Sequence, residues 1–420
     1  MTVEIQARPR WSTAQRIAFR FFFSYFCLFF IADRLVRTVP FSDLLLRKYT
    51  TVWYLIVGWL EGHVLHTGYE VQRLDDVENI SNTFFGTILF LCYVTLAAVA
   101  TVVWSTLDRK RVEYERLHQV FRYLLRFSLA LTMISYGILK VIPTQMISPP
   151  PLGMLKRPIG DFTPMMLLWT FMGASPAYES LTGCAELLGG ILLLVPRTTL
   201  LGAAVCLANM TMVFTLNMCY DVHVKLYSLH LWLMAALLVA PDLHRLAALF
   251  LFNRTVEPAV RPPLFGRRAT DRALQALLFL VGLIMIAVTF VQTYERYQTF
   301  HPPKPPLYGV WTVEDFTVDG REVPMDADPR RWRWVTFRDP GALWVEHRIG
   351  SRQKYDLALD MKRGTMILGK EAVFSFARPQ EDVLLLNGTL DGHRTRAKLT
   401  RMALLRRRFH WIFVAPKEDL

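Results

Sequence analysis

The chain has 420 residues, of which 53% are hydrophobic and 13% aromatic, and its mean hydropathy is positive. Soluble domains have a smaller fraction of apolar residues. Here the apolar residues also come in blocks rather than in amphipathic stripes, and together these two features exclude an ordinary soluble fold. The formal net charge is +13, but zinc-finger spacing and interleaved basic and aromatic residues are both missing from the sequence, so we expect no nucleic-acid partner.

Seven apolar blocks are long enough for membrane-spanning helices, which need about 20 mostly apolar residues. The candidate spans are 17–34, 84–104, 124–142, 182–196, 199–217, 226–241 and 273–293. The predicted fold class is therefore an α-helical integral membrane bundle of about seven transmembrane helices in a lipid bilayer.

Basic residues mark alternate connections between the spans. They gather in the N-terminus, in 108–122, at Arg197 and in 245–272. By the positive-inside rule these parts are cytoplasmic, so the N-terminus is inside and the C-terminal region outside the inner (plasma) membrane. On the outer side, 49–70 is expected to form a helix at the outer leaflet, and 143–181 a proline-broken connector followed by a short apolar helix.

The residues after the last span read differently. A proline-rich linker leads into short segments of period two that are separated by Gly, Asp or Asn turns, and this pattern predicts a small all-β barrel or sandwich over 306–420. Its opening, "GVWTVEDFTVDG", resembles the first strand of lipocalin-like barrels. The aromatic residues expected to fill its core are Trp311, Trp332, Trp334, Phe376 and Trp411.

The chain thus divides into four predicted parts. They are a two-span region with an interfacial helix (1–123), a four-helix membrane core (124–242), a cytoplasmic loop with the seventh span (243–300) and an extracytoplasmic β domain (301–420).

Four consecutive spans carry polar side chains at the same end. Because neighbouring spans run in opposite directions, the end of 124–142, the start of 182–196, the end of 199–217 and the start of 226–241 all face the outer side. The side chains at these ends are Tyr136, Lys140, Gln145, Glu179, Glu186, Asn217, Tyr220, Asp221, Lys225, Tyr227 and His230. A charge inside a bilayer needs a partner or a water-filled pocket, so we expect these residues to line one outer-leaflet pocket.

Spacing predicts particular contacts in this pocket. Asp221 and Lys225 can pair at four residues' separation on one helix. Lys140 is the expected counter-ion of Glu186, and the glycines at 189–190 let a neighbouring helix approach closely. The alternative for each residue is structural: lysines that snorkel to headgroups, tyrosines in an aromatic belt, and a glutamate in an ion pair without further role.

Several chemistries are disfavoured. The third, fourth and fifth spans contain no histidine for a haem. His223 and His230 lie about 10 Å apart along a helix, too far to chelate one metal without a carboxylate, and no metal site is expected. The sequence lacks nucleotide-binding and hydrolase motifs. The cysteines lie in or beside the spans as thiols, with a disulfide between Cys184 and Cys219 as the alternative.

The stretch from about 124 to 242 resembles the DoxX-like membrane family. The matching features, in order, are Gly137 and Lys140 ending the first core helix, Glu186 followed by Gly189 and Gly190 in the second, Arg197 and Thr198 after it, and a polar start to the fourth. The resemblance implies a four-helix membrane core in a respiratory or redox-associated setting, because the family includes the small subunit of an archaeal quinol oxidase and its thiosulfate:quinone oxidoreductase relative.

Two hypotheses of different class remain. In the first, the pocket binds a quinone or a similar amphipathic molecule, as part of a quinone-linked oxidoreductase with a redox partner protein. The catalytic candidates are Lys140, Glu186 and His230, and the other residues of the pocket bind the substrate. In the second, the protein is a non-enzymatic scaffold whose β domain binds lipid, envelope or protein. A transporter is disfavoured because neither an inverted repeat nor a pair of broken helices is visible.

Overall fold

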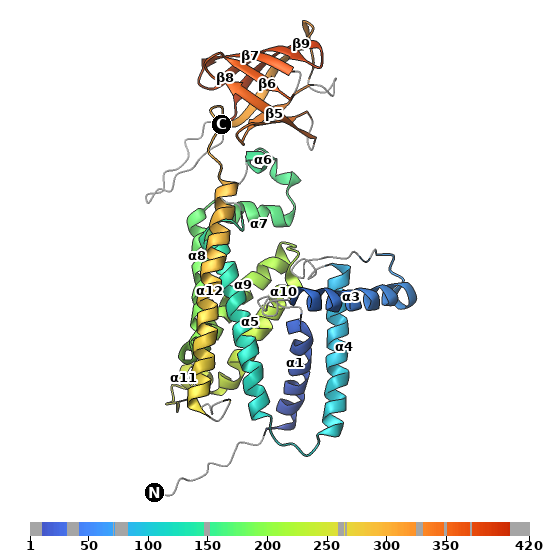
Figure 1. Cartoon of the computed structure of the whole chain (residues 1–420), viewed down its shortest axis with the longest axis vertical. Helices are drawn as coiled ribbons and strands as arrows, with labels where there is room; N and C mark the ends of the chain where they lie inside the picture. The colour runs from blue at the N-terminus through green and yellow to red at the C-terminus, as the bar shows by residue number, and fades with distance from the viewer. Residues whose placement is uncertain are drawn as a thin grey trace. The chain divides into compact units, whose positions relative to one another are not determined.

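The computed structural model describes residues 11–31, 42–69, 71, 83–146, 152–258, 264, 267–324, 331–347, 351–369 and 372–403. The chain forms two compact units (Figure 1). The first comprises residues 1–146 and 163–296, and the second comprises residues 147–162 and 297–420.

The first unit is helical. Its elements are α1 (Thr13–Ile31), α3 (Ser42–Leu60), η1 (Glu61–Leu65), α4 (Phe84–Leu107), α5 (Glu115–Val141), α7 (Pro164–Gly173), α8 (Pro176–Leu194), η4 (Pro196–Thr198), α9 (Thr199–Cys219), α10 (Lys225–Val239), η5 (Ala240–Asp242), α11 (Leu243–Phe250) and most of α12 (Arg268–Phe300). Within the described residues, seven stretches are long and apolar enough to cross a membrane: α1, α4, α5, α8, η4 with α9, α10 to α11, and α12. The prediction of a multi-pass membrane bundle is confirmed.

Helix starts follow the capping residues of the sequence. The hydroxyl of Thr83 accepts a hydrogen bond from an amide in the first turn of α4, and Thr163 and Ser175 do the same for α7 and α8. Pro164 and Pro176 occupy the first helical position, where no backbone donor is lost. These caps fix the helix starts on either side of the short connection between α7 and α8.

Four helices form the centre of the unit, where α5 and α8, α8 and α9, α9 and α10, and α10 and α5 are packed together. The prediction for the glycines at 189–190 is confirmed. A Cβ on Gly190 would lie 2.8 Å from Ile134 of α5, and one on Gly189 would lie 2.7 Å from the sulfur of Cys206 in α9. The two glycines therefore admit different neighbours on the two sides of α8.

Two helices outside this centre were also predicted. A helix does cover most of 49–70, as α3 with η1, but it begins seven residues earlier, at Ser42. Figure 1 shows α3 lying across α1 and α4 rather than alongside them. The short apolar helix expected within 143–181 is α7. α1 packs against α4, so the N-terminal spans form a pair beside the central four helices.

The second unit is built on a closed antiparallel barrel of eight strands, with β2 as a short arm on β1. The strands are β1 (Gly309–Val318), β2 (Arg321–Glu322), β3 (Trp334–Phe337), β4 (Ala342–Glu346), β5 (Arg352–Asp360), β6 (Thr365–Leu368), β7 (Ala372–Gln380), β8 (Val383–Leu390) and β9 (His393–Arg401). Pairing of β1 with β9 closes the barrel. The Asp-Gly pairs at 319–320 and 391–392 have positive φ at both positions, which gives the type I′ turns that suit tight hairpins.

Large side chains fill the barrel core. Trp311, Trp332 and Phe374 are fully buried there, and Phe376 packs partly buried against them, as predicted. The prediction for Trp334 is wrong. Its ring lies on the outer face of β3, where the ammonium of Lys156 is 4.6 Å and the guanidinium of Arg333 is 4.2 Å from the ring centroid. Trp411 lies outside the described residues.

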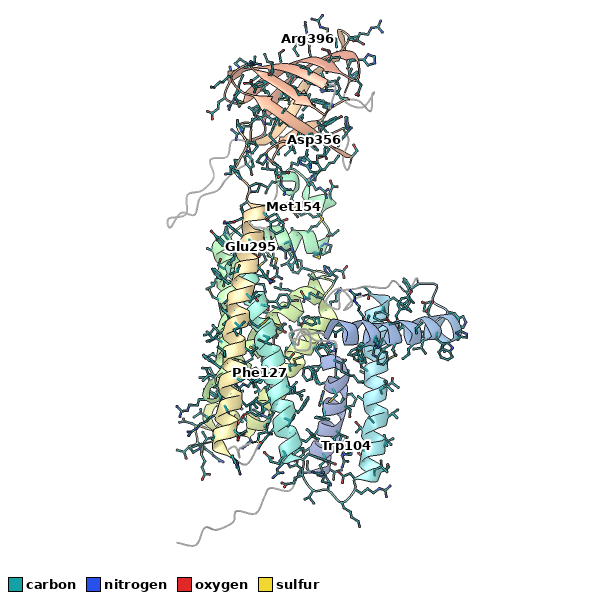
Figure 2. All side chains as sticks on the ribbon, in the orientation of Figure 1. Trp104, Phe127, Met154, Glu295, Asp356 and Arg396 are labelled. Carbon is teal, nitrogen blue, oxygen red and sulfur yellow. The ribbon has the colours of Figure 1, made fainter. Side chains whose placement is uncertain are left out.

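A piece of the membrane region belongs to the barrel unit. The connection between α5 and α7 contributes α6 (Leu152–Leu155) and η3 (Ile159–Asp161) to it (Figure 2, where Met154 marks α6). Lys156 forms a buried ion pair with Glu346 of β4. Arg352 of β5 approaches the same carboxylate at 3.5 Å, and its guanidinium lies over Gly153, where an added side chain would have to displace it. The sequence boundary at 301 therefore misses part of this unit.

Candidate functional site

The central feature of the helical unit is a buried ion pair between two core helices. Lys140, in the last turn of α5, donates to Oε1 of Glu186, in the middle of α8. The two residues are 6% and 4% exposed. The predicted pairing is confirmed. Removing two charges from water is costly unless each also meets further polar groups, so the surroundings of this pair decide what it can do.

Lys140 reaches its partner through a gap that Gly183 leaves in α8. A Cβ on Gly183 would lie 2.7 Å from the Cβ of Lys140 and 2.6 Å from the amide of Val141. Gly183 stands between Glu179 and Glu186 on the sequence of α8, four residues after one and three before the other. These spacings place all three on one stripe of the helix. One lysine therefore lies against α8 between two carboxyl groups.

Glu179 is the most deeply buried of these groups, with no exposed surface. Its Oε1 accepts a hydrogen bond of 3.0 Å from the backbone amide of Met146. Lys140 is close enough to Glu179 to interact with it electrostatically, although its ammonium pairs with Glu186. Among the described residues, neither Oε2 of Glu179 nor Oε2 of Glu186 has a hydrogen-bond partner.

Two amide side chains at the same end of the bundle also bury a polar atom that lacks a hydrogen-bond partner among the described residues. The Oε1 atom of Gln145, just after α5, and the Nδ2 atom of Asn217, near the end of α9, are buried, and neither has a hydrogen-bond partner in the described part of the chain. Buried polar groups are nearly always paired, so a cluster of unpaired ones demands an explanation. Acceptors and a donor are both present, which suits a small polar group with mixed hydrogen-bonding capacity.

Apolar side chains cover the loop side of this cluster. Met146 packs with Leu168 and Met172 of α7 and with Val222 of the connection between α9 and α10. Tyr220 is half-buried against the same group. α7 and this connection therefore separate the polar cluster from solvent at this end, which strengthens every electrostatic interaction beneath them.

Two tyrosines lie against each other where α5 meets α10. Tyr136 of α5 and Tyr227 of α10 have ring centroids 6.3 Å apart, and Tyr227 is buried. The sequence predicted both for the site, and the structure brings them together across the contact between α5 and α10.

His230 was predicted for the same pocket, but its contacts lie elsewhere. Its Nε2 meets the hydroxyl of Tyr25 in α1, and its ring stacks on Phe29 at 4.4 Å. Its Nδ1 lies against the carbonyl oxygen of Leu226, which can only accept, so Nδ1 carries the proton and Nε2 accepts from Tyr25. The side chain thus ties α10 to α1.

Asp221 and Lys225 pair as predicted, one turn apart. The side chain of Asp221 is 79% exposed, however, and that of Lys225 is 25% exposed. Solvent access therefore distinguishes these two Lys–carboxylate pairs of the helical unit: Lys140–Glu186 is enclosed, and Asp221–Lys225 faces outward.

Some buried polar groups were missed at the sequence level. Asn209 in α9 and Thr132 in α5 each keep a buried polar atom without a partner among the described residues. Tyr25 is joined by Tyr93 of α4, whose ring lies 6.2 Å away, and Tyr93 shares a 2.8 Å hydrogen bond with Tyr49 of α3. A lone amide or phenol in an otherwise apolar helix is the signal that could have drawn attention to them.

The cysteines and potential metal ligands were also located. All five cysteines are free, so the alternative of a disulfide between Cys184 and Cys219 is not realised. Over the described ranges, no group of three or more His, Cys, Asp or Glu side chains is placed to hold a metal ion.

Fold and site together define a multi-pass membrane protein with a buried polar cluster in its helical core and a C-terminal β-barrel. The uncharacterized protein YwoB of Bacillus subtilis (strain 168) is 32% identical over 134 residues, which cover 30% of this chain and 79% of the Bacillus protein. The chain therefore belongs to the same family as YwoB. No family model matches the chain, and no solved structure matches it.

Proposed function

We propose that the helical core binds the polar head of a quinone or a similar amphipathic molecule beside the Lys140–Glu186 pair. The observation that carries this proposal is the set of buried polar atoms without a partner among the described residues, on Glu179 and Glu186 of α8, on Gln145 just after α5 and on Asn217 near the end of α9. Each unpaired buried group costs about 1 to 3 kcal/mol, and a bound headgroup would recover that free energy.

The chemistry of the cluster matches the two forms of a quinone. The oxidised form offers carbonyl oxygens, which the ammonium of Lys140 and the amide of Asn217 can bind as donors. The reduced form offers hydroxyl groups, which can donate hydrogen bonds to the free carboxyl oxygen of Glu186 and, once Glu179 is ionised, to that of Glu179. A site with both kinds of group can hold either form and can exchange protons with it.

The cellular setting follows from charge and resemblance. The basic connections 108–122 and 245–272 favour a plasma-membrane protein with a cytoplasmic N-terminus and an extracytoplasmic barrel. In this orientation the polar cluster lies near the outer surface, and α3 lies at the outer leaflet. The resemblance of 124–242 to DoxX-like proteins supports a redox-associated role with a partner protein.

Extraction of the purified protein tests the proposal. Lipid extracts of the wild-type protein, the Lys140→Met/Glu186→Gln variant and the Asp221→Asn/Lys225→Met variant are compared by mass spectrometry for co-purifying quinone. The last variant is the matched control, because it removes a Lys–carboxylate pair that faces solvent. We expect quinone in the wild-type and control proteins and its loss from the buried-pair variant. Equal amounts in all three would refute the proposal.

The second candidate, a scaffold that binds through its barrel, is favoured by one observation. Arg394 and Arg396 lie exposed two residues apart on β9 and so share the outer face of the barrel, on which Figure 2 marks Arg396. The barrel core is filled by aromatic side chains, so a partner would bind this outer face and would be acidic. Loss of cellular activity in Arg394→Gln/Arg396→Gln, with the buried-pair variant fully active, would favour this candidate.

A further inference from the structure

The buried cluster holds two carboxyl groups and one cation. Of the ionisable groups on the described elements around it, Lys140 is the cation of the pair, Glu179 and Glu186 are the carboxyl groups, and Tyr136, Cys206 and Tyr227 are neutral in their usual state. The other charged or titratable groups of these elements make contacts elsewhere: Arg126 with backbone carbonyls, Asp221 with Lys225, and His230 with Tyr25. The segment "PMMLLWTFMG" of α7, which covers the cluster, contains no ionisable side chain. With both carboxyl groups ionised, the cluster would carry an uncompensated negative charge in a membrane core.

The two carboxyl groups are not equivalent. Glu186 receives the ammonium of Lys140, whereas Glu179 receives only backbone amides, those of Met146 and Gln145. Glu179 is also fully buried, with the apolar side chains around Met146 and Met172 on its loop side. A backbone amide stabilises a buried carboxylate far less than an ammonium does. Of the two carboxyl groups, Glu179 is therefore the one whose protonation makes the cluster neutral.

We propose that Glu179 carries a proton in the resting protein and delivers it to the molecule bound in the core. Its protonated Oε2 is then a hydrogen-bond donor, and this is the atom that has no partner among the described residues. The delivery step, though not the protonation itself, rests on the proposed function.

The step balances without electron transfer. The O–H bond at Oε2 of Glu179 breaks and a new O–H bond forms on the oxyanion of a reduced quinone, which becomes neutral. Glu179 becomes a carboxylate, and the charge of the cluster changes by the charge of one proton. Lys140 already lies between Glu179 and Glu186, so it can share its ammonium with the new carboxylate and stabilise it. In this assignment Glu179 is the proton donor and Lys140 the group that stabilises the product.

Two isosteric variants of the full-length protein separate the carboxyl groups. Glu179→Gln replaces a neutral acid by a neutral amide and keeps the acceptor for the Met146 amide, so its Tm should stay within about 2 °C of wild type. Glu186→Gln leaves Lys140 without its partner, and its Tm should fall by more than about 5 °C. Equal falls in both variants would show that Glu179 is ionised, and would overturn the proposal.

Infrared spectroscopy of the wild-type protein gives a measurement that does not depend on how the variants fold, and the spectra of the folded variants assign the band. The wild-type protein should show the carbonyl-stretch band of a protonated carboxylic acid, and the band should disappear in Glu179→Gln and persist in Glu186→Gln. A wild-type spectrum without this band, or a band that persists in Glu179→Gln, would overturn the proposal. Neither measurement needs a ligand, so a protein that shows the band but binds no quinone would refute the proposed function and the delivery step while the protonation of Glu179 stands.

Discussion

The Cβ of Lys140 lies 2.7 Å from the position that a Cβ on Gly183 would occupy, so the lysine and a side chain at position 183 cannot coexist without movement. We predict that Gly183→Ala separates α5 from α8 and lowers stability by about 1 to 3 kcal/mol, the usual cost of overpacking. Gly58 of α3 has open space around it, and Gly58→Ala is the matched control. It should be neutral or stabilising, because alanine is the better helix former. Thermal unfolding of both variants checks this, and equal destabilisation would contradict it.

The Lys140–Glu186 pair should behave as a unit. Lys140→Met alone strands a carboxylate in the membrane core, and we expect a loss of about 3 to 5 kcal/mol. Lys140→Met/Glu186→Gln removes both charges and should recover most of that loss, because no uncompensated charge remains. A double-mutant cycle from denaturant unfolding measures the coupling. Additive losses would mean that the two side chains do not interact.

The contact between Tyr25 and His230 should be structural. Tyr25→Phe leaves the buried Nε2 of His230 without its donor and should destabilise the protein by about 1 to 3 kcal/mol. Tyr25→Phe/His230→Phe removes both partners and should be less damaging than the single change. Both variants should retain bound quinone, since His230 contacts α1 rather than the ion pair. If a folded Tyr25→Phe protein lost its quinone, His230 would instead be part of the ligand site.

The barrel unit should be more stable in alkali than at neutral pH. Burial lowers the pKa of Lys156 below the ordinary lysine value, and its pairing with Glu346 only partly offsets this. The unfolded chain therefore binds more protons than the folded one between the two pKa values, and stability rises with pH across that window. We expect this rise in unfolding followed by barrel tryptophan fluorescence, and its absence in Lys156→Met/Glu346→Gln. A rise of the same size in that variant would assign the effect to another group.

The same ion pair changes how the barrel should be removed in experiments. Lys156 belongs to the connection between α5 and α7. Deleting 301–420 removes both of its partners, the carboxylate of Glu346 and the ring of Trp334, and leaves the lysine exposed. A deletion that abolishes activity would thus confuse loss of the barrel with damage to this connection. Substitutions on the outer face of β9 avoid the problem.

The membrane bundle and the barrel were both predictable from local pattern. Apolar blocks mark spans whatever they pack against, and alternation with Asp-Gly turns marks strands of a hairpin such as β8 and β9. The Lys140–Glu186 pair was predictable as well, because an intramembrane lysine and glutamate at matched depth have few other partners.

Other features depend on contacts that local pattern does not contain. The depth of His230 was readable from the sequence, but the side of α10 that faces α1 depends on how the N-terminal spans pack. Lys156 and Glu346 are 190 residues apart, and their pairing joins a membrane loop to a strand of the barrel. The ring of Trp334 lies on the outer face of β3, where Lys156 of the connection between α5 and α7 covers it. Its aromatic character alone predicted the inner face, in the barrel core.

A binding titration shows directly whether the Lys140–Glu186 pair holds a quinone headgroup. A short-chain quinone analogue is titrated into the purified wild-type protein, the Lys140→Met/Glu186→Gln variant and the Asp221→Asn/Lys225→Met control, and Kd is measured for each. We expect a Kd at least tenfold higher for the buried-pair variant, a loss of about 1.4 kcal/mol or more in binding free energy, with the Kd of the control unchanged from wild type. The same Kd for the buried-pair variant and the wild-type protein, with both folded, would contradict it.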